Sequence, residues 1–160
     1  MKNNGFTLLE IIVVMVILSL FFSSLIGSYI FIVNKSLKTI KSSQNLYRYT
    51  KSIYLLKNSV ACAKDIKIDN SQEYPKLYLY TYCGVYKGFS KEVFFVKDHH
   101  LYLYAYPYKF GSLHFYDKTK ATKLIPIKIF KAKFLSKGMI SIYIDQNRFN
   151  IPLLGTYAVK

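Results

Sequence analysis

The chain opens with Gly5-Phe6-Thr7-Leu8-Leu9-Glu10, and an apolar segment follows directly and ends near Val33. Glu10 is the one charged residue between Gly5 and Val33. A charge placed inside a membrane segment costs roughly 2.5–3.5 kcal/mol on insertion scales, so such residues usually serve a function. A lone carboxylate at the head of an uncharged segment therefore predicts a functional site at Glu10.

The segment from Ile11 to Val33 is long enough, as a helix, to cross a hydrocarbon core of about 30 Å. A cleaved secretory signal has a shorter apolar core and a small-residue cleavage site after that core. Here the small residue Gly5 comes before the apolar segment, which predicts that the helix stays attached as a single membrane span. The simpler alternative is a plain membrane anchor that tolerates a glutamate near the interface.

These opening residues resemble the type III signal of type IV pilins and type II secretion pseudopilins. Proteins of that family have a short basic leader that ends in Gly, a Phe-Thr-Leu-x-Glu start and a long hydrophobic helix. The resemblance covers residues 1–35 and implies cleavage by a prepilin peptidase after Gly5. It also implies N-methylation of Phe6, and a role in assembly for Glu10 through the freed amino group of Phe6 on a neighbouring subunit.

The resemblance implies an α+β, pilin-like fold, in which a long N-terminal α-helix packs on a C-terminal antiparallel β-sheet. We expect a leader peptide at 1–5 and a transmembrane and assembly helix at 6–33. An exported continuation of that helix should follow at 34–65, and a β-rich globular domain at 66–160.

The lysines around the span conflict with the orientation that this resemblance implies. Lys35, Lys38 and Lys41 follow the span, whereas Lys2 precedes it, and the positive-inside rule alone would place the lysine-rich end in the cytoplasm. The resemblance and a pair of cysteines favour the opposite orientation. We therefore expect a single-pass protein of the bacterial inner membrane, with its C-terminal domain in the periplasm or another extracytoplasmic space. This orientation runs against the positive-inside rule.

The residues from Asn34 to Ala63 include no proline or glycine, which favours a continuing helix. Apolar residues recur there at steps of three and four, and this stripe is predicted to pack on the globular domain: Leu46, Tyr49, Ile53, Leu56, Val60 and Ala63.

After Asp69-Asn70-Ser71 the hydrophobic period changes to two, which is typical of strands. Short connections between the strands favour an antiparallel meander. The predicted strands are Lys76–Tyr82, Glu92–Lys97, Leu101–Tyr108, Ser112–Tyr116, Lys123–Phe134, Met139–Asp145 and Arg148–Leu153.

Cys62 and Cys83 are the two cysteines of the chain. An even pair in an exported domain more often forms a disulfide than a catalytic couple, so we expect a bridge from the helix end to the first strand. The alternative is two separate buried thiols.

The chain is strongly basic, with 23 Lys and Arg, eight acids and a net charge of +15. Lysine clusters attract phosphates without regard to sequence, and tyrosines can stack on single-stranded bases. A candidate DNA or anion site therefore consists of Lys118, Lys120, Lys123, Lys128, Lys131, Lys133 and Lys137. A basic surface that faces anionic lipid or an acidic partner subunit is the competing interpretation.

No pattern in the sequence indicates catalysis. His99, His100 and His114 lack the spacing of a metal site, and the sequence has no phosphate-binding glycine loop and no serine nucleophile elbow. We expect no enzyme activity, no metal and no cofactor.

Taken together, the resemblance implies a subunit that assembles through its N-terminal helix into a periplasmic pseudopilus or a type IV pilus. We expect a minor component that serves DNA uptake or type II protein secretion. The implied partners are other pilin or pseudopilin subunits, the prepilin peptidase, an inner-membrane platform protein, an assembly ATPase and the membrane, with DNA as a further candidate. The alternative is a membrane-anchored basic protein that binds nucleic acid outside any filament.

Overall fold

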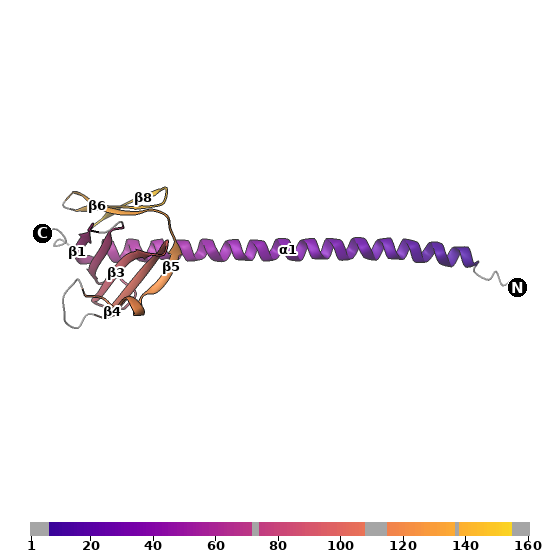
Figure 1. Ribbon diagram of the computed structural model, residues 1–160, viewed down its shortest axis with the longest axis horizontal. Helices are drawn as coiled ribbons and strands as arrows, with labels where there is room; N and C mark the ends of the chain where they lie inside the picture. The colour runs from indigo at the N-terminus through magenta and orange to yellow at the C-terminus, as the bar shows by residue number, and fades with distance from the viewer. Residues whose placement is uncertain (1–6, 72–73, 108–114, 137, 155–160) are drawn as a thin grey trace. The chain divides into compact units, whose positions relative to one another are not determined.

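The computed structural model describes residues 7–71, 74–107, 115–136 and 138–154. The chain divides into two compact units, Met1–Asn45 and Leu46–Lys160. A single long helix, α1 (Leu8–Ala61), is followed by a β-rich region, as Figure 1 shows. The predicted α+β class is therefore confirmed. The later elements are β1 (Ala63–Asp69), β2 (Lys76–Thr81), β3 (Ser90–Lys97), β4 (His100–Pro107), the short 3-10 helix η1 (Lys118–Lys120), β5 (Thr122–Pro126), β6 (Phe130–Ser136), β7 (Met139–Ile144) and β8 (Asn147–Pro152).

The two units contain parts of α1 with different environments. Between Thr7 and Asn45 every side chain except that of Val33 is exposed. In the second unit the helix buries Ser52, Ile53, Leu56, Ser59 and Val60.

The predicted apolar stripe is confirmed at its C-terminal end and wrong at its start. Ile53, Leu56, Val60 and Ala63 are buried, but Leu46 is 66% exposed. Tyr49 marks the first contact, because its hydroxyl accepts a hydrogen bond of 3.0 Å from the Asn147 side chain. Leu46 lies about one turn before that contact and has no packed surface to meet.

The helix ends at Ala61, earlier than the predicted boundary at residue 65, and the next residues form β1. This strand was not predicted from the sequence. Its main chain pairs antiparallel with β2, and its alternation turns Ile66 into the core while Lys67 faces outward. Pairing with β2 therefore ends the helix here, although the chain from Asn34 to Ala63 contains no proline or glycine.

Two antiparallel sheets follow the helix, with strand orders β1-β2-β3-β4-β5 and β6-β7-β8. Figure 1 shows them as separate sets of arrows near the C-terminal end of α1. The two-residue turn between β3 and β4 places Asp98 and His99 at φ 49° and 54°, a conformation suited to tight hairpins. The antiparallel meander was predicted, but its division into two sheets was not.

The predicted strand Lys123–Phe134 is wrong, because β5 and β6 divide it between the two sheets. Pro126 ends β5 without a main-chain N–H, and the N–H of Ile127 donates to the His99 carbonyl at 2.9 Å. The Asp145 carboxylate then accepts hydrogen bonds from the N–H groups of Lys128 and Ile129, at 2.6 and 3.0 Å. These bonds hold the chain in the crossing between the sheets.

The predicted strand Ser112–Tyr116 lies mostly outside the described residues. Phe115 and Tyr116 lie outside any strand, and residues 112–114 are outside the described residues.

A single core joins the end of α1 to both sheets. Its largest fully buried side chains include Leu56 from the helix, Leu77, Phe94 and Leu101 from the larger sheet, and Phe130, Ile140 and Ile142 from the smaller one. The opposite face of the larger sheet has a second cluster of Tyr78, Val93, Phe95 and Tyr104, and Tyr116 packs against it. Aromatic residues that alternate with core residues along these strands thus form a separate layer on this face.

Candidate functional site

The N-terminal end of α1 is closed by a reciprocal pair of hydrogen bonds between Thr7 and Glu10. The Thr7 N–H donates to Glu10 Oε2 at 2.9 Å, and the Glu10 N–H donates to Thr7 Oγ1 at 3.4 Å. This is a capping box, which satisfies helix N–H groups that have no partner within the helix. The carboxylate also lies at the positive end of the helix dipole, which favours its charge. Gly5 and Phe6 lie outside the described residues.

The unit that contains Glu10 exposes an uninterrupted apolar surface. Its large side chains from Leu8 to Phe31 are between 47% and 77% exposed. Each such side chain gains about 1.5–3 kcal/mol when it leaves water, so this helix requires an apolar environment. Its length and composition allow it to cross a membrane.

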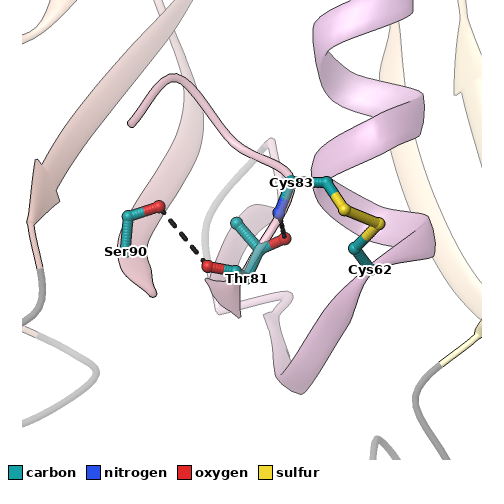
Figure 2. Close-up of a disulfide and its surroundings, with 4 residues drawn as sticks. All are labelled: Cys62, Thr81, Cys83 and Ser90. Atoms are coloured by element: carbon teal, nitrogen blue, oxygen red, sulfur yellow. Dashed lines mark hydrogen bonds between the residues drawn. A yellow bond between two sulfur atoms is a disulfide. The ribbon is translucent and has the colours of Figure 1, made fainter. Parts of the chain in front are cut away.

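Cys62 and Cys83 form a disulfide with a Cα–Cα distance of 5.6 Å. Figure 2 shows Cys62 where the helix ends and Cys83 beside Thr81, whose hydroxyl accepts a 3.3 Å hydrogen bond from the Cys83 N–H. The predicted pairing is present. The bridge joins the helix end to the connection that follows β2. It was predicted to reach the first strand, but β1 precedes β2 in the chain.

The connection between β2 and β3 is also held by a buried carboxyl group. Glu92 is fully buried and its Oε1 accepts a 2.7 Å hydrogen bond from the Val85 N–H. A methyl group at Gly84 would overlap this carboxyl group, so a larger residue there would displace the Glu92 side chain. Burial raises the pKa of Glu92, and interactions with Ser59 and the Val85 N–H oppose that change.

The raised pKa gives a pH-dependent prediction for Glu92→Gln. Above its ordinary pKa the unfolded chain ionises Glu92 freely, whereas the folded chain must bury the charge, so wild-type stability falls as pH rises through the raised value. Glutamine keeps an acceptor for Val85 and does not ionise. The variant should therefore gain stability over wild type from pH 4 to pH 8, as measured by thermal unfolding in non-ionic detergent. A stability difference that is independent of pH would contradict this reading.

Four cationic side chains line one groove of about 450 Å³ in the second unit. Arg48 and Lys51 come from α1, Lys120 from η1 and Lys123 from β5. Lys120 and Lys123 belong to the predicted basic set, whereas Arg48 and Lys51 do not. Their spacing of three on a helix is the signal that could have found them.

The other predicted lysines that the structure describes do not line this groove. Lys118 is exposed on η1 beside it, and Lys128 is exposed between β5 and β6. Lys131 and Lys133 line a different hollow of about 560 Å³ that also contains the acid Asp145. Lys137 lies outside the described residues. The structure thus divides the predicted set instead of gathering it.

Two comparisons with known proteins bear on this arrangement. A family model described as "Prokaryotic N-terminal methylation motif" matches residues 1–26, a range that includes Gly5, Phe6 and Glu10. The chain is also 36% identical over 135 residues to an uncharacterized protein of Aquifex aeolicus (strain VF5). That alignment covers 80% of this chain and 73% of the relative.

The methylation motif at residues 1–26 and the long apolar helix at the N-terminus are consistent with a prepilin-like type IV pilin or pseudopilin. No solved structure matches it. The α+β architecture, with one long helix before the strands, is also pilin-like. A prepilin-like protein of this kind is anchored in the membrane by a single span and assembles with other pilin subunits after processing by the prepilin peptidase.

Prepilin-like proteins form a structural class rather than an enzymatic one. Among the described residues no group of three or more His, Cys, Asp and Glu side chains gathers to hold a metal ion.

Proposed function

We propose that this prepilin-like chain is a minor subunit of a short extracytoplasmic filament that serves DNA uptake or type II protein secretion. Peptidase cleavage after Gly5 leaves Phe6 as an N-methylated first residue. The β-rich domain faces the periplasm, and a platform protein and an assembly ATPase drive the subunit out of the inner membrane. In this proposal residues 1–5 are the leader and 6–33 the transmembrane and assembly helix. Residues 34–65 hold the exported part of the helix, which ends at Ala61, and residues 66–160 form the globular domain.

The observation that carries this proposal is the lone carboxylate at the head of an exposed apolar helix. No other acid occurs before Asp65. In a shared helical core the ammonium group of Phe6 on a neighbouring subunit would neutralise Glu10, because an unpaired charge in an apolar environment is costly. That single pairing would fix the axial register of the incoming subunit.

The capping box supports this role because it fixes the Glu10 carboxylate at the helix end before any partner arrives. The hydrogen bonds that the structure shows to this carboxylate all reach Oε2 and come from Thr7, at 2.9 and 3.2 Å. A carboxylate accepts up to about four hydrogen bonds, so it can keep the cap and accept an ammonium group as well.

The balance of charge supports DNA uptake over secretion. A net charge of +15 attracts polyanions without sequence specificity, as nucleic-acid-binding proteins do.

Mass spectrometry of the native N-terminus tests the processing step. We expect a chain that begins with methylated Phe6, because the motif places the cleavage site after Gly5. An intact Met1 would contradict the filament and would favour the alternative, a membrane-anchored basic protein that binds nucleic acid. A deletion strain scored for transformation, secretion and twitching would then identify the filament system.

A further inference from the structure

The basic groove brings together cations that are distant in the sequence. Arg48 and Lys51 are contributed by α1, and Lys120 and Lys123 come from around β5. None of the described residues that line the groove is acidic. The Asp117 carboxylate lies close to one of these cations, with its Oδ2 3.8 Å from Lys120 Nζ.

The floor of the same groove is apolar. Leu55, Leu103, Ala105 and Leu124 line it, and Tyr86 from the β2–β3 connection stands at its side with 41% of its surface exposed. A volume of about 450 Å³ falls within the usual range for small-molecule sites. A ligand that matches the groove therefore combines several negative charges with flat apolar groups.

We propose that this groove binds single-stranded nucleic acid. The Arg48 guanidinium and the three lysines contact successive phosphates, and arginine does so in a bidentate manner. One base lies over the apolar floor and stacks on the Tyr86 ring, as bases do on aromatic side chains in other single-strand sites. This inference deepens the DNA-uptake role proposed above and rests on it only for its biological setting.

Other polyanions match the groove less well. In a duplex the bases are stacked inside the helix, so the apolar floor and Tyr86 would have nothing to contact. An acidic peptide supplies carboxylates but no flat ring in each repeat. An anionic membrane presents its charges in a plane, whereas these four cations line a hollow.

Binding can be measured by fluorescence anisotropy of a labelled oligo-dT, with the full chain in a non-ionic detergent. The double variants Arg48→Gln/Lys51→Gln and Lys120→Gln/Lys123→Gln should each weaken binding by about tenfold or more at moderate salt. Each should also flatten the slope of log K against log salt by about 1.4, since each phosphate contact on a single strand contributes about 0.7. Tyr86→Ala should weaken binding by about tenfold, and an abasic oligonucleotide should be insensitive to that change.

The matched control is Lys131→Gln/Lys133→Gln, which removes the same charge from β6 outside the groove. We expect a loss of less than threefold, because only the general attraction between the chain and the polyanion changes. An equal loss in the control and the groove variants would overturn the proposal. So would competition by a poly-glutamate peptide or by anionic vesicles that is as strong as competition by unlabelled oligo-dT, or preference for duplex DNA. An oligo-U arm shows whether the groove distinguishes DNA from RNA.

A substitution at Asp117 should strengthen oligo-dT binding instead of weakening it. Hydrogen bonds from the Thr119 side chain and then its N–H lower the pKa of Asp117, so it stays charged beside Lys120. Asp117→Asn keeps an acceptor at the start of η1 and removes the charge. Binding should tighten by about threefold, and weaker binding would contradict the placement of phosphate at Lys120.

Failure of this inference and failure of the proposed function are distinguishable. If the chain assembles but groove variants bind oligo-dT normally, the groove assignment alone is wrong. If the groove variants lose oligo-dT binding but the chain enters no filament, the groove assignment is correct and the proposed role as a filament subunit is wrong.

Discussion

Glu10→Gln should abolish incorporation of the subunit into its filament and leave membrane insertion intact. Glutamine retains the capping box, since Glu and Gln serve equally at that position, but it cannot neutralise the Phe6 ammonium group of a neighbour. Removal of one partner from a buried ion pair costs about 3–5 kcal/mol, which corresponds to more than a hundredfold in the association constant. Shearing of filaments from cells, followed by immunoblotting of both filament and membrane fractions, measures the effect. Glu10→Ala should give the same assembly defect.

The matched control is Thr7→Ala, which removes the cap and keeps the charge. It should destabilise the first helical turn by about 1 kcal/mol and still permit assembly. If Glu10→Gln enters filaments normally, the proposed pairing is wrong. If Thr7→Ala alone blocks assembly, the helix cap and not the charge is the important feature.

Cys62→Ser/Cys83→Ser should lower the free energy of unfolding of the β-rich unit by about 3 kcal/mol. The bridge spans 21 residues of sequence, and its loss lets the unfolded chain sample many more conformations. The unfolding midpoint should fall by about 10 °C or more for a unit of this size. Thermal unfolding with and without reductant measures the change in detergent-solubilised full chain.

Reductant should destabilise wild type to the level of the double variant and leave the variant unchanged. Equal stability of wild type and variant, or free thiols in freshly isolated wild-type protein, would contradict a structural role. Since the disulfide holds the connection that carries Tyr86, we also expect the double variant to bind oligo-dT more weakly.

The sequence predicted the elements whose signals are local. The apolar segment after Glu10 predicted the helix, and regular alternation predicted β2, β3, β4, β7 and β8. It failed where partners distant in sequence decide the outcome. β1 forms because β2 pairs with it, and β5 separates from β6 because His99 and Asp145 bind the main chain between them.

The candidate basic site shows the same division. A list of exposed lysines could be read from the sequence, but Lys131 and Lys133 lie in one hollow while Lys120 and Lys123 lie in another. Arg48 and Lys51 precede Lys120 and Lys123 by more than sixty residues in the chain. The two pairs come together only after the end of α1 has packed on the larger sheet.

The sequence by itself determined the N-terminal motif, the membrane-spanning helix and the cysteine pair, because each depends on neighbouring residues or on composition. Tertiary structure alone decided the end of α1, the two sheets and the basic groove. The physical reason is that strand pairing and burial join residues far apart in the chain, and their free energy outweighs the local preference of any one segment.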